Sequence, residues 1–473
     1  MSFIRYKTVK GRIYAYEVTA YWDTELKKPR QKSEYLGVVE KAGDTPQKKE
    51  IVQKLQLDFG DGYLLHKFIA NSNCYEIIQN VFSTKFPELL PLIYYRLCMQ
   101  SAMYNAEAWL EGNITRTLFA GSKLLSQDIS VMLKKLGDES IQREFFTQYL
   151  SKVNKSSRSI LIDATSLPNS SELALNSWGH NDNGMSKQLR MLCVVDQENG
   201  QPLFYRAVPG NILDLSTLQN TLIELKQMDL SCSFVLLDAG YFSEDNTNKL
   251  YEQNIHFLTR MQKSRIQYKK LIKTELDDLE SVKYATKNGK RGIFAKCVEI
   301  NLFKHKAYAY IVLDPVRKGK EMQDLLIACG EDTAASEIQQ SDLDGCGVVV
   351  FVSSLKLEAK EVVSHYYTRM QIEQVFSFCK SDLQLLPLRK HSDETMSGYL
   401  FVQFIILIIF IQIRNAVCDK YTVEQALLLT RNIKCKIFGS DVLIAEFTKK
   451  QKEIYKLCEV TIPKSCKVKI NQM

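Results

Sequence analysis

The segment Ser159-Ile160-Leu161-Ile162-Asp163 decides the fold, because a short apolar strand ends there in a carboxylate. A second apolar run, Phe234–Asp238, ends in the same way and is followed by Ala239-Gly240-Tyr241. Two carboxylates at neighbouring strand ends repel each other unless a cation lies between them. Asp163 and Asp238 therefore predict a metal site at the rim of a sheet.

The residues around these two runs predict the rest of the sheet. Met191–Val195 is apolar, and the polar turn Gln197–Gly200 joins it to Leu203–Val208 as a hairpin. Further on, helices are predicted at 215–227 and 243–253, and strands at 234–238 and 255–259. Hairpin-joined strands followed by alternating helices and strands predict an α/β fold with a ribonuclease-H-like core.

Changes of pattern along the chain predict its domain organisation. Short strand-like runs (Ile13–Val18, Ser33–Val39) give way to helical spacing from about residue 80. The predicted parts are an N-terminal β-rich DNA-binding unit (1–79), a helical domain (80–157), the first part of the core (158–264), a mainly β insertion (265–346), the second part of the core (347–420) and a basic C-terminal region (421–473).

Composition places the chain among soluble, multidomain proteins. Its 473 residues carry 62 Lys and Arg against 54 Asp and Glu, a formal net charge of +8 that fits DNA binding without requiring it. The basic turn with Lys27, Lys28, Arg30 and Lys32 indicates either contact with DNA or a solvated hairpin edge.

The 12 cysteines form no CxxC pair, which favours reduced thiols in the cytoplasm. The N-terminus does not resemble a secretory signal, and the apolar run Tyr399–Ile413 is short for a bilayer, so we expect a buried helix and no membrane.

One long helix is predicted over 357–383. Tyr366, Arg369, Glu373 and Lys380 lie at offsets of 0, 3, 7 and 14 in it. At about 100° per residue they share one stripe of an α-helix, within an arc of about 60°. Glu373 can complete the metal site while the cations meet phosphate oxygens. The alternative is a solvated i, i+4 ion pair between Arg369 and Glu373.

The spacing of these four residues resembles the signature of one branch of bacterial insertion-sequence DDE transposases. Leu161–Thr165 is similar to the segment around that family's first Asp, and Leu237–Phe242 to the segment around its second. Other similar motifs are Gly184-Met185-Ser186-Lys187, Pro209–Asp214, Tyr21-Trp22-Asp23 and Leu36-Gly37. A departure is Met370, because the family commonly has Trp after the signature Arg. In that branch a mainly β insertion separates the second Asp from the Glu.

The resemblance implies that Asp163, Asp238 and Glu373 are both the catalytic and the metal-binding residues. They would hold two Mg²⁺ ions, or Mn²⁺ as a substitute, because hard cations prefer carboxylate ligands. The expected DNA-binding residues are Tyr366, Arg369, Lys380, Lys187 and Arg190. For Lys187 and Arg190, in the loop predicted before the second strand, a solvated loop is the alternative.

The function that this resemblance implies is transposition. The protein would bind the terminal inverted repeats of its element, cleave the DNA and join the 3′ ends to target DNA by a cut-and-paste mechanism. A homodimer on double-stranded DNA in the bacterial cytoplasm, associated with the nucleoid, is expected. The alternatives are a structure-selective nuclease that never joins strands and a non-catalytic DNA-binding derivative.

Overall fold

The computed structural model describes most of the chain and divides it into two compact units. The described residues are 2–9, 11–23, 27–39, 41, 55–82, 86–99, 101–152, 158–181, 184–212, 214–288, 291–328, 343–382, 385–386, 388, 390–417, 420–439, 441–463 and 467–469. The small unit comprises Met1–Leu57, Lys434–Ala445 and Pro463–Met473. The large unit comprises Asp58–Ile433 and Glu446–Ile462.

The small unit contains two β-sheets. The first is antiparallel, in the order β1-β2-β3, and its strands are β1 (Ser2–Val9), β2 (Arg12–Asp23) and β3 (Lys28–Val39). The second has the order β17-β16-β15-β4, with β4 (Leu55–Asp58), β15 (Lys434–Phe438), β16 (Asp441–Ile444) and β17 (Lys467–Lys469). The strand-like runs 13–18 and 33–39 lie in β2 and β3, so the prediction of strands there is confirmed.

The large unit begins with helices, earlier than the predicted boundary at residue 80. They are α1 (Gly60–Ala70), α2 (Asn73–Phe82), α3 (Leu89–Cys98), η1 (Met103–Asn105), α4 (Ala106–Gly112), α5 (Thr115–Leu118), α6 (Ser126–Leu136) and α7 (Glu139–Lys152). The start of α1 was not predicted because its first residue is Gly60, and glycine is a poor helix former. The fold needs it there, because a Cβ on Gly60 would lie 2.1 Å from the carbonyl oxygen of Thr430.

C-terminal helices hold this helical part together. Thr430 lies in α15 (Val423–Arg431), which packs on α1, and α16 (Lys449–Leu457) packs on α15. The Nε of Arg431 donates to the carboxylate of fully buried Asp61 at 2.9 Å, and the Tyr455 hydroxyl donates to the Gly60 carbonyl at 2.6 Å. The predicted basic C-terminal region is therefore structured, with α15 and α16 in the large unit and β15–β17 in the small unit.

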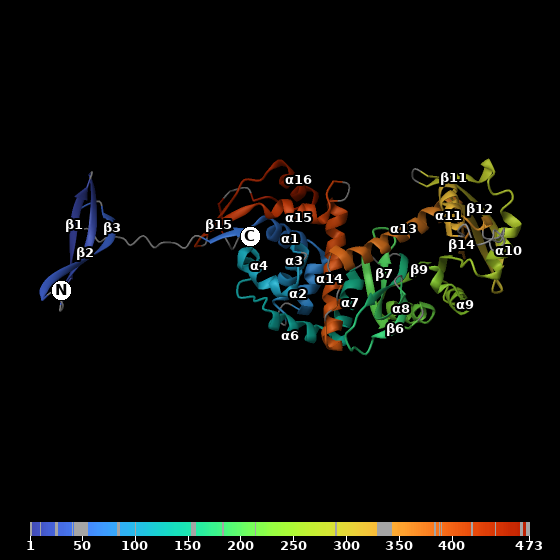
Figure 1. Ribbon diagram of the computed structural model, residues 1–473, viewed down its shortest axis with the longest axis horizontal. Helices are drawn as coiled ribbons and strands as arrows, with labels where there is room; N and C mark the ends of the chain where they lie inside the picture. The colour runs from blue at the N-terminus through green and yellow to red at the C-terminus, as the bar shows by residue number, and fades with distance from the viewer. Residues whose placement is uncertain are drawn as a thin grey trace. The chain divides into compact units, whose positions relative to one another are not determined.

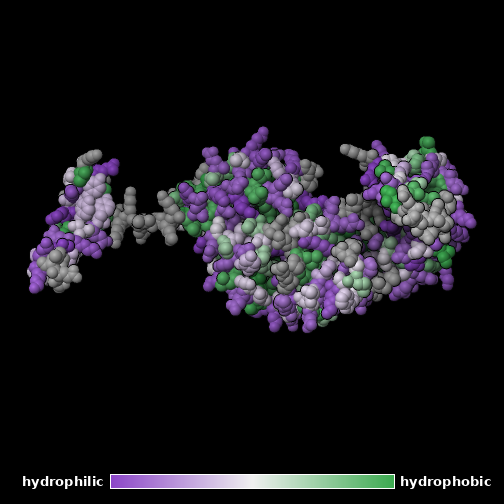
Figure 2. Space-filling view, viewed as in Figure 1, coloured by the Kyte–Doolittle hydropathy of each residue, from purple (hydrophilic) through white to green (hydrophobic). Residues whose placement is uncertain are grey.

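One long apolar helix, α14 (Asp393–Val417), forms the core of the large unit (Figure 1). It contacts α3 and α6 and also strand β8 (Pro202–Pro209). Its length and composition would allow a membrane span, but 89% of its apolar window is buried inside the structure. Hydrophilic residues are spread among hydrophobic ones on the visible surface of this unit (Figure 2). The prediction of a buried helix is confirmed.

A ten-stranded mixed sheet packs beside α14. Its order is β11-β12-β13-β14-β10-β9-β5-β7-β6, with β8 also paired to β7. The strands are β5 (Arg158–Pro168), β6 (Ser177–Asn181), β7 (Gly184–Asp196), β9 (Cys232–Leu237), β10 (His256–Arg260), β11 (Ala285–Asn288), β12 (Arg291–Leu302), β13 (His305–Leu313) and β14 (Val348–Ser353). β5, β9 and β10 run parallel, whereas β7 is antiparallel to β5 and β8.

The predicted insertion extends this sheet. Its strands β11, β12 and β13 join the core through β14, which pairs with β13 on one side and β10 on the other. It also contains helices α10 (Ile266–Glu275) and α11 (Pro315–Ala328). The linker-like stretch 330–340 lies outside the described residues. The core helices are α8 (Asp214–Gln227) and α9 (Glu244–Glu252).

The predicted long helix is α13 (Ala359–Ser377), which continues as a π-helix over Phe378–Asp382. A capping box fixes its start, since the side chains of Glu358 and Glu361 each accept from the other's backbone N–H. α13 contacts β11 and β12, and also β5 and β9, so it crosses much of the sheet (Figure 1).

Gly398 provides a test of the core packing. An alanine Cβ at this position of α14 would lie 1.8 Å from the carbonyl oxygen of Leu133 in α6, so Gly398→Ala should destabilise the large unit by about 2 kcal/mol or more. Gly319→Ala in α11 is the matched control, because nothing lies within 4 Å of a Cβ there. It should be neutral or stabilising by up to about 1 kcal/mol. Thermal and urea unfolding would measure both; equal effects would contradict the close approach of α6 and α14.

Candidate active site

The register of the parallel strands β5 and β9 sets the two predicted aspartates next to each other. The strands pair from Ser159 with Phe234 to Ile162 with Leu237. Asp163 and Asp238 are each the next residue, and Asp238 keeps an extended backbone (φ −73°, ψ 163°). Neighbouring strands lie about 4.8 Å apart, and paired residues point to the same face. Both carboxylates therefore lie on one face of the sheet.

Asp163 differs from its prediction in one respect. It was expected to end a strand, but β5 continues to Pro168 by pairing with β7 alone. The parallel partner β9 stops at Leu237, where a 3₁₀ turn over Ala239–Tyr241 begins. Asp163 lies at the point where β5 loses β9 as a partner and keeps β7, and it is 8% exposed. Its carboxylate accepts from the backbone N–H of Ala164 at 2.9 Å.

The face that carries the two aspartates is the one that α13 covers. Phe234 is in phase with Asp238 along β9, and its ring lies 6.1 Å from the ring of His365 in α13. Cys193 is the partner of Asp163 across β7 and β5. Burial raises the pKa of the Cys193 thiol well above its usual value, with further contributions from the nearby Cys379 and Asp163. α13 and the π-helix therefore lie over the aspartate pair.

Glu373 lies on this covering helix with an exposed side chain. Within the described ranges, which include all three predicted acids, no three His, Cys, Asp or Glu side chains are grouped closely enough to hold a metal ion. The pairing register sets Asp163 beside Asp238 on neighbouring strands, and Glu373 lies on the helix that contacts both strands. Oxygen donors of this kind suit a hard divalent cation, and the pair supplies part of such a donor set.

The remaining residues of the predicted helix stripe divide between two kinds of helix. The backbones of Tyr366 and Arg369 belong to α13, but their side chains lie outside the described part of the chain. Half-buried Lys380 lies in the π-helix, whose turn is wider than that of an α-helix. The α-helical projection that placed Lys380 on the same stripe therefore does not apply to it. π-Helical turns are frequent at functional sites.

Lys187 and Arg190 lie within strand β7, so the prediction of a loop for them is wrong. The hairpin with β6 was missed because its strand is short and polar, and Gly184, with φ +102°, forms the turn. Alternation along β7 puts exposed Lys187 on the face of Cys193 and Asp163. Arg190 points to the opposite face, where it donates to the carbonyl oxygen of Ile212 at 3.2 Å.

The two glycine-containing motifs that follow the first Asp pack against each other. A Cβ on Gly210 would lie 2.2 Å from the backbone oxygen of Gln188, the residue after Lys187. The Nδ2 of Asn181 donates to the Ser186 hydroxyl at 2.6 Å and to Gln188 at 2.8 Å across the hairpin. These motifs therefore fix the β6–β7 hairpin, and with it the position of Lys187.

His365 is a site residue whose role the sequence did not reveal. It hydrogen bonds with Gln197, in the turn after β7, and contacts Phe234. Burial lowers its pKa, and the opposing effect of Glu361 is smaller. His365 therefore anchors the first half of α13 to the sheet. No spacing in the sequence links residues 197, 234 and 365.

The structure is a mixed α/β fold with one large sheet, in which two neighbouring strands carry the aspartates and a helix that contacts both strands carries a third acid. The family model described as "Transposase DDE domain" matches residues 154–409, more than half of the chain. The chain belongs to this family of DNA transposases, whose members generally use divalent metal ions.

Two further comparisons complete these findings. None of the curated proteins matches the chain. Six chains of known structure do, among them the piggyBac transposase synaptic complex with hairpin DNA, at 10% identity and a TM-score of 0.37. That match covers 84% of this chain and 70% of the other.

The aspartate pair predicts a gain of stability when one charge is removed. Like charges opposite each other on neighbouring strands are destabilising, so Asp238→Asn should raise the free energy of unfolding by about 0.5–1 kcal/mol in metal-free buffer. Asp245→Asn, at an exposed position of α9, is the matched control and should give no gain. Thermal unfolding in chelator would measure both. A stability loss in Asp238→Asn would contradict the proximity of the pair.

Proposed function

We propose that the chain is a cut-and-paste DNA transposase of the Tyr-Arg-Glu-Lys branch of bacterial insertion-sequence transposases. It binds the terminal inverted repeats of its element, cleaves the element ends and joins the 3′ ends to target DNA. The observation that carries the proposal is the side-by-side placement of Asp163 and Asp238 beneath α13, the helix with Glu373, inside the matched domain.

The order of the core strands supports a ribonuclease-H-like assignment. β8, β7 and β5 are neighbours joined antiparallel, and β9 and β10 follow β5 in parallel. Helix α8 connects β8 to β9, and α9 connects β9 to β10. This is the order expected from the sequence for such a core, with the aspartates on its two central strands. β14 carries the strands of the insertion at the edge formed by β10.

Asp163, Asp238 and Glu373 would hold Mg²⁺, as two ions for which Mn²⁺ can substitute. Such ions lower the pKa of an attacking water or 3′-hydroxyl and neutralise charge on the departing oxygen. Glu373 would complete the donor set from α13, which contacts β5 and β9, the strands that lead to the two aspartates.

The chain's basic residues would position the DNA strand. Lys187 is exposed on the face of Asp163, and Lys380 follows α13 in the π-helix. Their ammonium groups would contact phosphates, as would the guanidinium of Arg369, while Tyr366 would stack on a base. Arg190, on the opposite face, would support strand β7 through its hydrogen bond to the carbonyl oxygen of Ile212. A homodimer would hold two ends together, in the nucleoid of a bacterial cytoplasm.

Cleavage of DNA by the full chain tests this proposal. With Mg²⁺ and a duplex carrying the element's terminal sequence, the protein should nick the strand at the element end and join a precleaved 3′ end to a target plasmid. Asp163→Asn should lower both rates by about 10³-fold or more while DNA binding persists. Asp245→Asn should leave both rates unchanged, because it lies on the exposed side of α9.

Each other outcome identifies a different function. Cleavage without joined product would favour a structure-selective nuclease. Tight binding of the terminal sequence with no cleavage in Mg²⁺ or Mn²⁺ would favour a non-catalytic derivative. Full activity of Asp163→Asn would contradict the assigned site.

A further inference from the structure

The sheet formed by β1, β2 and β3 has two chemically different faces. The pairing register puts Arg5 opposite Tyr16, Lys7 opposite Tyr14 and Tyr16 opposite Tyr35, so these side chains share one face. The aromatic face, as we define it, consists of Phe3, Arg5, Lys7, Val9, Arg12, Tyr14, Tyr16, Val18, Ala20, Trp22, Pro29, Gln31, Ser33, Tyr35 and Val38. The opposite face carries both signs of charge, with Glu17 paired with Glu34 and Asp23 paired with Lys28, and also Arg30, Lys32, Ile4, Tyr6 and Tyr21.

Large rings are exposed on the aromatic face. Phe3 is 48% exposed, Tyr35 54% and Trp22 61%. The ring of Tyr35 lies 6.2 Å from that of Tyr14 and 5.4 Å from that of Tyr16, in tilted orientations. Exposed apolar surface of this kind, set among charges, marks a place of interaction. The visible side of the sheet is mostly hydrophilic to intermediate in hydropathy, with a few hydrophobic residues among them (Figure 2).

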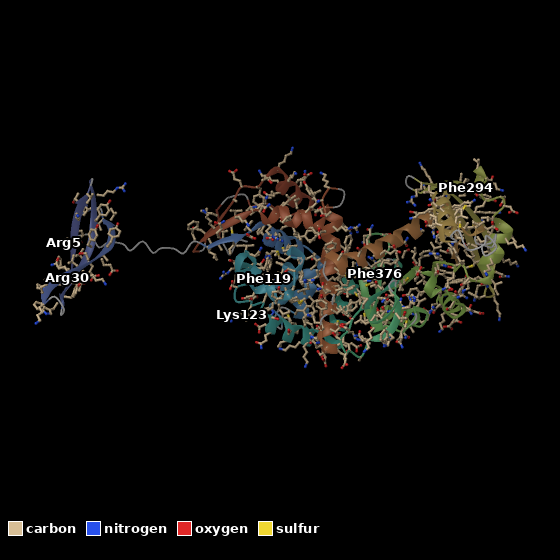
Figure 3. All side chains as sticks on the ribbon, in the orientation of Figure 1. Arg5, Arg30, Phe119, Lys123, Phe294 and Phe376 are labelled. Atoms are coloured by element: carbon tan, nitrogen blue, oxygen red, sulfur yellow. The ribbon has the colours of Figure 1, made fainter. Side chains whose placement is uncertain are left out.

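The charge on the aromatic face has one sign. Arg5, Lys7 and Arg12 lie on it, and no Asp or Glu of the described strand residues does. The guanidinium of Arg5 lies 5.9 Å from the centroid of the Phe3 ring on the same strand. Figure 3 shows Arg5 and Arg30 on this sheet, and the register assigns them to opposite faces. A partner of this face is therefore polyanionic and offers apolar or ring surfaces.

The shape of the sheet selects duplex DNA among such partners. Three strands are about 10 Å wide from the first to the third, close to the roughly 12 Å width of the major groove. The tyrosine rings are tilted and packed on one another, whereas a platform for single strands presents separate rings on which successive bases stack. Tyrosine hydroxyls and ring edges suit the donors, acceptors and thymine methyls at base edges.

We propose that the aromatic face of β1–β3 docks in the major groove of duplex DNA. Arg5, Lys7 and Arg12 contact the phosphates on the groove walls, and Tyr14, Tyr16 and Tyr35 face the base edges. The identity of that DNA, the terminal sequence of the element, rests on the proposed function. The basic residues Lys28, Arg30 and Lys32 near the second turn, which the sequence offered as the DNA contact, are on the opposite face and are not part of this surface.

A pair of charge-matched triple variants of the full chain tests the proposal. Arg5→Ser/Lys7→Ser/Arg12→Ser and Lys28→Ser/Arg30→Ser/Lys32→Ser each remove three positive charges, from the aromatic and the opposite face respectively. The probe is a fluorescent duplex of the element's terminal sequence, with the same sequence as a single strand for comparison. The aromatic-face variant should bind the duplex about 10–100-fold more weakly, with the salt slope reduced by about 2–3. The opposite-face variant should stay within about threefold of the unchanged protein.

Trp22 gives a second readout that leaves the basic residues intact. In a Trp109→Phe/Trp178→Phe background it is the remaining tryptophan of the chain. Its fluorescence should change when the duplex is added, since it lies exposed on the aromatic face. Equal losses in the two triple variants, an unresponsive Trp22, or tighter binding of the single strand than of the duplex would overturn the proposal.

The binding and cleavage assays distinguish a failure of this inference from a failure of the proposed function. If duplex binding depends on the aromatic face but no DNA is cleaved, this inference stands and the proposed function fails. If the chain cleaves and joins DNA while the aromatic-face variant binds normally, the inference alone fails.

Discussion

The register between β5 and β9 places two carboxylates on neighbouring strands and on one face of a sheet, and the proposed site depends on this arrangement of like charges. A protein without a cation gains nothing from such a pair. The pair is kept because the surrounding strands are fixed by packing: Ile160, Leu161 and Ile162 before Asp163 are at most 1% exposed, and each buried aliphatic side chain contributes about 1.5–3 kcal/mol. The free energy gained by burying these side chains exceeds the cost of the repulsion between Asp163 and Asp238. The same packing holds the two strands in the register that sets the carboxylates side by side.

Two helices, α13 and α14, pack on the sheet that carries the aspartate pair. α14 is the fixed part, buried along most of its length and locked to α6 by close backbone approach at Gly398. α13 is attached at one end through His365 and Gln197, and at the other through the π-helix, where the rings of Phe378 and Phe410 lie 5.0 Å apart. Between these attachments lies Glu373, whose side chain is exposed. The position of Glu373 over the sheet therefore follows from how α13 is held.

The sequence predicted those features that depend on local pattern. Apolar runs ending in Asp163 and Asp238 gave the central strands, and helical spacing gave α13 and α14. Features that depend on distant partners were missed. β5 extends past Asp163 because β7 continues beside it, and a glycine stands at the start of α1 because Thr430 leaves no room for a side chain there. The placement of Glu373 relative to the pair is likewise a tertiary property that spacing along one helix cannot determine.

We propose that Asp163 and Asp238 bind a divalent metal ion and that Glu373 is a further ligand of that ion on DNA. A crystal structure of the full chain with a precleaved element end and Mn²⁺, measured for anomalous scattering, tests it most directly. Mn²⁺ is expected about 2.1 Å from oxygens of both Asp163 and Asp238, with Glu373 as a further ligand. Mn²⁺ bound elsewhere in the DNA complex, with no ligand from these three acids, would contradict the assigned site.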